Sequence, residues 1–297
     1  MSINLGLKRV VKLLGYIGNP QEKIKVLHVA GTNGKGSVCS YLTSILQQQR
    51  LNHVGKFTSP HLIHITDSIT INNKPIPWKF YNDIRKNLDT LNSSHDLQCT
   101  EFELLTCTAL KYFCDSKCDW CVIEVGLGGR LDATNVVPGR CKLACGITKI
   151  GLDHESFLGN TLPEIAEQKA GIITEDVPIA VVDGSNEECA LEEVRKQCNR
   201  IGCELRITDP TFPGESVNTE SWGMVKPENL PLNGSYQICN LRVALSILDF
   251  LQLKKHISIS ITDIYNGLKS VDWAGRLQEL DYCYSSNRNS TIPLLLD

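Results

Sequence analysis

Two hydrophobic patterns alternate along the chain. The first consists of short, mostly apolar runs of the length of buried strands, at residues 26–30, 120–125, 143–150 and 177–182. The second consists of apolar residues at helical spacing, most clearly at Val38, Tyr41, Leu42, Ile45 and Leu46. Alternation of strands with helices is typical of a parallel sheet covered by helices. The pattern therefore predicts an α/β fold with a mostly parallel sheet.

Three further segments refine this outline. Thr161 and Glu164 form a capping-box sequence, which predicts a helix that starts there and ends near Gly171. Helical spacing returns over residues 238–248. Residues 209–233 contain four prolines and few periodic apolar positions, so we expect a long excursion over the surface there.

Composition limits the partners and the compartment. The formal net charge of the 297 residues is -3, which gives no general attraction for nucleic acid or an anionic membrane. No apolar run approaches the roughly 20 residues of a membrane span. The 13 cysteines are scattered and odd in number, as expected of thiols in a reducing compartment. We read Cys114, Cys118 and Cys121 as core residues rather than zinc ligands.

The N-terminal segment bears on localisation. Lys8, Arg9 and Lys12 occur without an acidic residue among the first 21 positions, which faintly resembles a transit peptide. The apolar positions of residues 7–14 also fit an ordinary amphipathic helix. We therefore expect a docked helix and a cytoplasmic protein, and a mitochondrial share stays open.

A glycine-rich loop between the first strand and its helix carries the clearest chemistry. Backbone N–H groups and a helix N-terminus create an anion site at such a loop. Lys35 adds a cation for β- and γ-phosphates. The loop differs from the strict Walker pattern because its spacing is shorter and Gly36 separates Lys35 from Ser37. The alternative is a glycine-rich turn with an exposed lysine. The loop comprises Gly31, Thr32, Asn33, Gly34, Lys35, Gly36 and Ser37.

Two more polar groups follow strands. Glu124 ends an apolar strand, where a carboxylate is costly unless it is paired or bound to a cation, so we predict a magnesium ligand. A buried ion pair with Arg130 is the alternative. His154 follows the strand that ends at Ile150, and we expect it to approach the same metal cluster as Glu124. Lys169, on the next helix, could be a solvated lysine.

The motifs together resemble the dihydrofolate synthase and folylpolyglutamate synthase family of the Mur ligase superfamily. The resemblance spans essentially the whole chain and rests on residues 28–37, 58–62, 124–135, 151–154, 158–162 and 169–173. Within the family, residues 67–77 and 100–108 look like fungal dihydrofolate synthases.

The resemblance implies a division of the chain. Residues 1–290 would form a P-loop-type ATP-binding domain of a monomeric protein, and residues 291–297 the first strand of a truncated, Rossmann-like C-terminal domain. In relatives the aspartate that matches Asp297 begins an Asp-Gly-Ala-His-Asn segment, and the domain that follows binds glutamate and completes the ATP pocket. We therefore expect residues 1–297 to bind nucleotide or pterin with negligible amide formation.

The resemblance also assigns roles to residues. The ATP triphosphate would lie on the glycine-rich loop, and Gln237, Asn240 and Arg276 match nucleotide-contacting positions. Two Mg²⁺ ions are implied, the first held by Ser59 and Glu124 and the second by His154. The lysine that matches Lys169 is carbamylated in relatives. The implied catalytic residues are Lys35, Glu124, His154 and Lys169.

Two positions depart from the family. Ala274 replaces a usual proline, and Asp67-Ser68 replaces an acidic-arginine pair.

The implied function is that of an ATP-dependent carboxylate-amine ligase. The carboxylate of 7,8-dihydropteroate would attack the γ-phosphate, and the amine of L-glutamate would then displace phosphate from the acyl phosphate. One alternative is a folylpolyglutamate synthase, which adds glutamate to reduced folates. Another is a nucleotide-binding remnant without turnover, because fold and motif do not prove activity.

Overall fold

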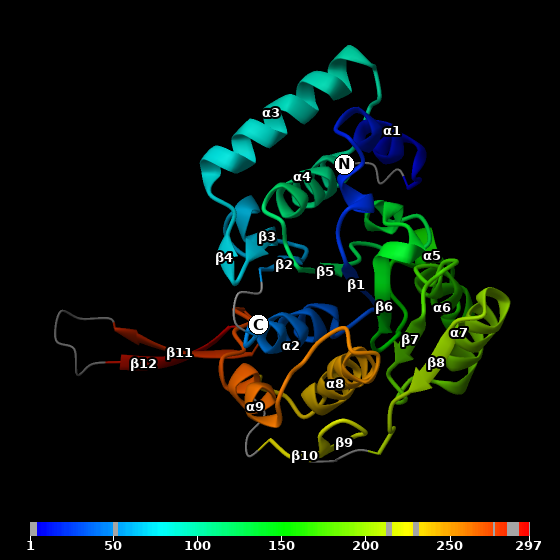
Figure 1. Cartoon of the computed structure of the whole chain (residues 1–297), viewed down its shortest axis with the longest axis vertical. Coiled ribbons are helices and arrows are strands. Elements are labelled where there is room, and N and C mark those ends of the chain that lie inside the picture. The colour runs from blue at the N-terminus through cyan, green and yellow to red at the C-terminus, as the bar shows by residue number, and fades with distance from the viewer. Residues whose placement is uncertain are drawn as a thin grey trace.

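A large sheet forms the centre of the molecule (Figure 1). The computed structural model describes residues 5–49, 53–211, 216–227, 232–275, 277–283 and 291–296. The sheet has eight strands in the order β4-β3-β2-β5-β1-β6-β7-β8. Six are parallel: β1 (Val26–Ala30), β2 (Val54–Phe57), β5 (Trp120–Glu124), β6 (Lys142–Ile147), β7 (Ile179–Val182) and β8 (Glu204–Ile207). At one edge β3 (Ile69–Ile71) and β4 (Lys74–Pro75) add antiparallel strands.

Helices cover both faces of this sheet (Figure 1). On one face lie α2 (Lys35–Leu46), α8 (Gln237–Leu253) and α9 (Ile261–Lys269). The other face carries α4 (Glu101–Asp115), α6 (Leu162–Ala170) and α7 (Glu188–Ile201), and α1 (Lys8–Tyr16) and α3 (Trp78–Ser94) pack on α4. The short α5 (Glu155–Leu158) precedes α6, and four 3-10 turns are η1 (Pro20–Glu22), η2 (Ile65–Ser68), η3 (Ala133–Val136) and η4 (Gly139–Cys141). The predicted α/β class with a mostly parallel sheet is confirmed.

The alternation of side chains along the strands decides which polar groups reach the α2 face. Leu27 and Val29 of β1 pack in the core beneath α2 and α8, whereas Val26 belongs to the core of the opposite face. Because successive side chains point to opposite faces, Glu124 shares the α2 face with Val122, two residues before it. The sheet therefore places a buried carboxylate beneath the start of α2.

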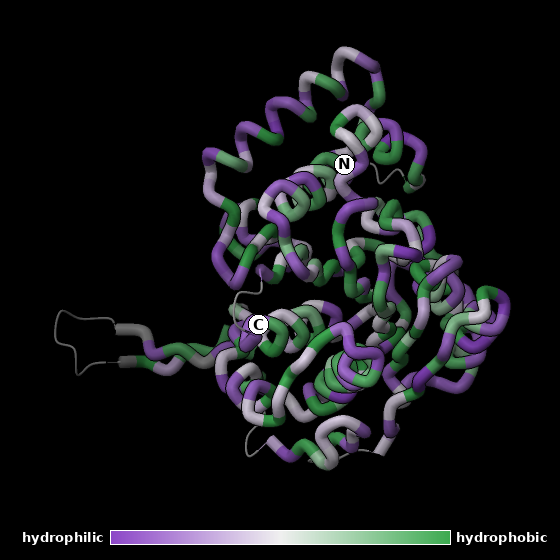
Figure 2. Tube along the Cα trace, viewed as in Figure 1, coloured by the Kyte–Doolittle hydropathy of each residue, from purple (hydrophilic) through white to green (hydrophobic). Residues whose placement is uncertain are grey.

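Most of the predicted elements are present. Helix α8 covers the repeat at residues 238–248, and the Thr161 hydroxyl accepts a bond from the Glu164 N–H at the start of α6. Strand β6 ends at Ile147, earlier than predicted, because Lys149 has left the sheet and its carbonyl accepts hydrogen bonds from the glycine-rich loop. Figure 2 shows the strongest hydrophobic colouring on the strands, α2 and α8, and a mixed pattern along α3.

The predicted surface excursion contains a short hairpin in its described part, β9 (Val217–Thr219) with β10 (Gly223–Val225). Residues 212–215 and 228–231 of the excursion lie outside the described residues. Cys118 and Cys121 are buried in the core of the α4 face, and Cys114 packs against it, as expected. In the described part of the chain, no helix has the length and apolarity to cross a membrane.

A second hairpin projects from the body beside α9 (Figure 1). It pairs β11 (Gln278–Cys283) with β12 (Thr291–Leu296) in an antiparallel ladder. Its exposed apolar side chains are Leu280, Ile292, Leu294, Leu295 and Leu296. The predicted boundary at residue 290 falls between these two strands and stays a prediction, and Asp297 lies outside the described residues.

A buried lysine ties the loop after β5 to the loop after α6. The Lys142 Nζ donates to Asn135 Oδ1 at 2.6 Å and to the carbonyl oxygen of Ile172 at 2.9 Å. The Asn135 amide in turn donates to the carbonyls of Arg130 and Gly171, at 3.0 and 3.1 Å. These bonds fix the segment that follows Glu124 against the end of α6.

Replacing Lys142 with methionine is expected to change how stability depends on pH. Burial lowers the pKa of Lys142 to about 8, whereas the pKa of an unfolded lysine is about 10.4. Below pH 8 the Lys142 side chain is protonated in both the folded and the unfolded state. Between these pKa values the unfolded state binds one more proton, so the unfolding free energy of the unmodified chain rises with pH, by up to about 3 kcal/mol.

Denaturant unfolding of both chains between about pH 7 and pH 10 checks this prediction. The free energy of unfolding should rise more steeply with pH for the unmodified chain than for Lys142→Met. A difference between the two chains that stays constant across this window would contradict it.

Candidate functional site

The glycine-rich loop turns directly into α2. Gly34, the residue before the helix, has φ +91°, in the left-handed region that favours glycine. The first N–H groups of a helix have no intrahelical partner, so those of Lys35, Gly36 and Ser37 are available to a ligand. The partial positive charge of the helix N-terminus favours an anion at this place.

The first half of the loop is anchored to the segment that follows β6. The N–H groups of Thr32 and Asn33 donate to the Lys149 carbonyl at 2.8 and 3.2 Å. The Thr32 hydroxyl donates to the Gly151 carbonyl at 3.1 Å and accepts from the Gly151 N–H at 3.0 Å. Two of the sequence motifs, the glycine-rich loop and the segment before His154, are therefore bonded to each other.

A cavity of about 700 Å³ opens over the start of α2. Lys35 and Thr32 both line it, and the Lys35 Nζ donates to the Thr32 carbonyl oxygen at 3.0 Å. The Gln237 amide donates to the Ser37 hydroxyl at 3.2 Å, and the Asn240 amide donates to Gln237 at 2.8 Å. The lining comprises residues 32–37, Glu124, Lys149, Asp183, Ser185, Tyr236, Gln237, Cys239, Asn240 and Trp273.

The Glu124 carboxylate lies at the floor of this cavity and is 5% exposed. Its Oε2 accepts the backbone N–H of Ser59 at 3.2 Å. The predicted alternative, an ion pair with Arg130, is wrong, because the Arg130 guanidinium pairs with Glu167 at 2.9 Å. Arg130 lies six residues after Glu124, the last residue of β5, and the loop carries it toward α6 instead.

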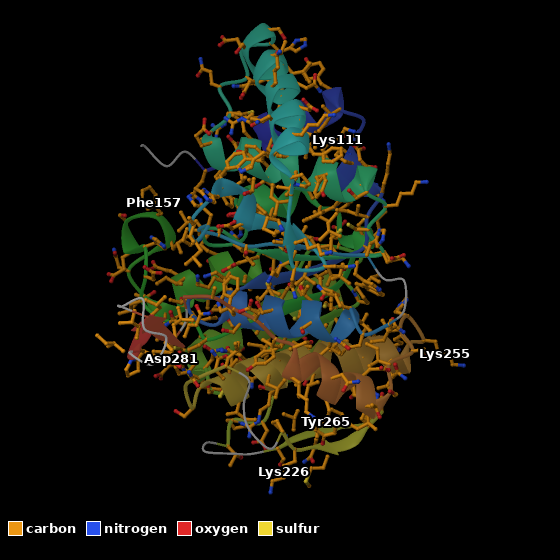
Figure 3. The ribbon with its side chains drawn as sticks, turned by 90° about the vertical axis from the view of Figure 1, so that its left-hand side faces the viewer. Lys111, Phe157, Lys226, Lys255, Tyr265 and Asp281 are labelled. Carbon is orange, nitrogen blue, oxygen red and sulfur yellow. The ribbon has the colours of Figure 1, made fainter. Side chains whose placement is uncertain are left out.

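A second cavity of about 540 Å³ lies on the other side of Ser59. Its walls include Ser59, His154 and Asp132, together with apolar and aromatic side chains such as Tyr81, Phe102, Leu105, Leu127 and Leu131. Helix α5 follows His154 and carries Phe157 at the surface of the molecule (Figure 3). Because Ser59 lines this cavity and bonds Glu124, which lines the other, the two cavities meet at this contact.

Asp132 is one of two buried carboxylates of the second cavity, the other being Glu103. One of its oxygens accepts the Leu127 N–H at 2.8 Å, and the other accepts the Thr134 N–H at 3.0 Å. Burial raises the pKa of Asp132, and these bonds act in the opposite direction. The Thr134 hydroxyl also lies 2.8 Å from Nε2 of the buried His28. The Asp132 carboxylate is thus held in one orientation at the cavity wall.

Lys169 is 3% exposed, so the alternative of a solvated helical lysine is wrong. Its Nζ donates to the Gly31 carbonyl at 2.9 Å. Burial, followed by the nearby cation of Lys35, lowers the pKa of Lys169 to about 8. A substantial share of this amine is therefore neutral just above neutral pH.

Most of the predicted site residues line one of the two cavities, whereas Gly31 and Lys169 line neither. Residues of the glycine-rich loop, with Glu124, Gln237 and Asn240, gather around the first cavity, whereas Ser59 and His154 line the second. The shared metal cluster of Glu124 and His154 stays a prediction, and no group of three or more His, Cys, Asp or Glu side chains is arranged for a metal among the described residues. Arg276 lies outside them.

Six residues that line the first cavity were not among the predicted site residues, and Lys149, Asp183 and Trp273 show why; the others are Ser185, Tyr236 and Cys239. Asp183 directly follows β7, so the rule that found Glu124 could also have found it. No local pattern marks Lys149 or Trp273. Lys149 lines the cavity because the chain leaves β6 early, and Trp273 comes from a segment distant in sequence.

Comparison with known proteins places this geometry in a family. The Mur ligase middle domain matches residues 29–248. The chain is 59% identical to the dihydrofolate synthetase of Saccharomyces cerevisiae, covering 100% of this chain and 69% of that protein. It is 42% identical to a probable folylpolyglutamate synthase of the same yeast, covering 98% and 68%.

A solved structure agrees with these matches. The folylpolyglutamate synthase of Mycobacterium tuberculosis, complexed with ADP and AMPPCP, is similar with a TM-score of 0.81 at 30% identity, covering 92% of this chain and 64% of that one. The chain thus spans about two thirds of the length of these proteins. It belongs to the Mur ligase family, in the branch of the dihydrofolate synthetases and folylpolyglutamate synthases, as its motifs predicted.

Proposed function

We propose that this chain forms the nucleotide- and acid-binding part of a dihydrofolate synthase, which joins L-glutamate to 7,8-dihydropteroate with conversion of ATP to ADP and phosphate. One observation favours dihydropteroate over a reduced folate as the acid substrate. The two yeast relatives differ in name and in similarity, and the dihydrofolate synthetase is 59% identical where the probable folylpolyglutamate synthase is 42% identical. The second candidate, a folylpolyglutamate synthase, would use the same two cavities.

The first cavity suits the triphosphate of ATP. The free N–H groups at the start of α2 and the Lys35 ammonium provide donors and a cation for phosphate oxygens. The relative from Mycobacterium tuberculosis was solved with ADP and AMPPCP, which supports this assignment. Gln237 and Asn240 extend the polar wall, and we propose that Arg276 adds a further contact.

The contact between the cavities suits Mg²⁺. This cation is usually held by one or two carboxylates plus phosphate oxygens and water, not by a dedicated protein cage. The Glu124 carboxylate and the Ser59 hydroxyl supply such a partial set where a triphosphate would end. When bound, Mg²⁺ would neutralise charge on the transferring phosphoryl group. A second ion near His154 belongs to the same proposal.

The second cavity suits the acid substrate. Aromatic and apolar walls with an oriented carboxylate, Asp132, fit a flat heterocycle that carries hydrogen-bond donors. The carboxylate end of dihydropteroate would then reach the contact between Ser59 and Glu124, beside the γ-phosphate. A carboxylate oxygen of dihydropteroate attacks the γ-phosphorus, and the bond from that phosphorus to ADP breaks. The amine nitrogen of glutamate then attacks the acyl carbon of the resulting acyl phosphate, and phosphate leaves. The chain contributes mainly orientation and charge.

Replacing Lys35 with alanine is expected to weaken binding of Mg·AMPPCP about 10- to 150-fold, because a charge-assisted bond to phosphate is lost while the backbone donors remain. Isothermal titration calorimetry measures the change. Lys79→Ala, which removes an exposed lysine of α3 outside both cavities, serves as the matched control. Equal affinities of Lys35→Ala and the control would refute the phosphate site.

The choice of acid is tested by equilibrium binding in the presence of Mg·AMPPCP. We expect residues 1–297 to bind dihydropteroate more tightly than tetrahydrofolate, by at least about tenfold, equal to about 1.4 kcal/mol. Asp132→Asn should weaken binding of dihydropteroate without changing that of AMPPCP, since Asp132 lines only the second cavity. Preference for tetrahydrofolate would favour the folylpolyglutamate synthase instead.

We also propose that Lys169 is carbamylated. Its neutral amine attacks CO₂, an N–C bond forms and a proton is released to solvent, which leaves an anion beside the metal region. The lowered pKa of about 8 supports this, because only the neutral amine reacts. A chain equilibrated with ¹³C-labelled bicarbonate should show a carbamate carbon resonance that is missing from Lys169→Arg. The same spectrum for both chains would end the proposal.

A further inference from the structure

The indole of Trp273 lies directly on the glycine-rich loop. A Cβ atom added to Gly36 would come within 2.8 Å of Cε2 and 3.1 Å of Cη2 of this ring, and closer still to its Cζ2. Any side chain at position 36 would therefore displace the indole. This contact gives a physical reason for the glycine that separates Lys35 from Ser37 and breaks the Walker pattern.

A buried lysine also lies over the indole ring. Lys56, on β2, is 6% exposed, and its Nζ lies 5.2 Å from the centroid of the Trp273 ring. Among the described residues, no hydrogen bond or salt bridge to this ammonium is present. Burial lowers the pKa of Lys56, and the nearby Asp272 and Glu124 act in the opposite direction. The aromatic face is thus a defined contact of this ammonium, and a desolvated cation–π contact is worth about 2 kcal/mol.

The segment that carries Trp273 also reaches the loop after β2. A Cβ atom added to Gly275 would lie 2.8 Å from Cδ1 of Leu62, three residues after Ser59. One short stretch of chain therefore contacts the first turn of α2 through Trp273 and the Ser59 loop through Gly275. Lys56, which contacts the Trp273 ring, lies on β2, the strand that leads into the Ser59 loop.

We propose that Trp273 is a positioning residue of the nucleotide site: its indole, in contact with Lys56 and packed close to Gly36, fixes the start of α2 relative to the Ser59 loop and so positions the β- and γ-phosphates. The inference rests on the proposed nucleotide site and adds two residues, Lys56 and Trp273, to it. The ring also forms part of the cavity wall beside Glu124. A bound triphosphate should therefore change its surroundings.

Substitution of Lys56 tests the proposal through nucleotide affinity. Lys56→Met keeps the length of the side chain and removes its charge, so the affinity for AMPPCP should fall about 3- to 30-fold. Lys56→Arg should restore most of it, because a guanidinium also stacks on an indole. The affinity for adenosine should change less than that for AMPPCP in Lys56→Met, since adenosine has no phosphates.

The matched control is Lys25→Met. Lys25 makes the same kind of contact with Trp120, at 5.5 Å, but neither residue lines the nucleotide cavity. This variant should bind AMPPCP like the unmodified chain. Equal affinities of Lys56→Met and Lys25→Met, or no restoration by Lys56→Arg, would overturn the proposal.

Tryptophan fluorescence gives a second measurement that does not depend on the folding of the Lys56 variants. Addition of AMPPCP to the unmodified chain should change the emission, and Trp273→Phe should remove this change. Trp78, Trp120 and Trp222 do not line the cavity. A change that persists in Trp273→Phe would refute the proposal. Failure of the unmodified chain to bind AMPPCP at all would refute the nucleotide site and this inference together.

Discussion

The pairing of the glycine-rich loop with the chain that leaves β6 is the constraint on which the rest of the site depends. Two loop N–H groups, those of Thr32 and Asn33, share the Lys149 carbonyl, and the Thr32 hydroxyl bonds both polar groups of the Gly151 backbone. Because these backbone donors are already used, the N–H groups left for a ligand come from the second half of the loop and the first turn of α2. The same bonds bring the segment of His154 to the edge of the sheet where Glu124 ends β5.

Around this anchor the fold keeps several charges out of water. Glu124, Asp132, Lys142 and Lys169 are all nearly buried. Such groups cost stability unless they are bonded, and each has hydrogen bonds that orient it. Lys142 differs from the others because it holds two loops together and lines neither cavity. A fixed polar frame of this kind suits a reaction that needs orientation and charge more than covalent help from the protein.

Sequence patterns predicted the elements of the sheet because its strands are buried on both faces and read as apolar runs. They also led to Glu124, since a carboxylate at the end of such a run is conspicuous. They could not place Lys169, because a buried and a solvated lysine have the same helical spacing. The partner of Arg130, Glu167, is likewise decided by where α6 packs. The contact of Trp273 with Gly36 joins distant segments, and no local pattern contains it.

We propose that the start of α2 and the contact between Ser59 and Glu124 together form one site for a metal-bound nucleotide. A crystal structure with Mg²⁺ and AMPPCP tests it most directly. We expect the β- and γ-phosphates on the N–H groups of the first turn of α2 with Lys35 beside them, and Mg²⁺ at about 2.1 Å from oxygens of Ser59 and Glu124. Phosphates bound elsewhere, or a metal that contacts neither residue, would contradict this account.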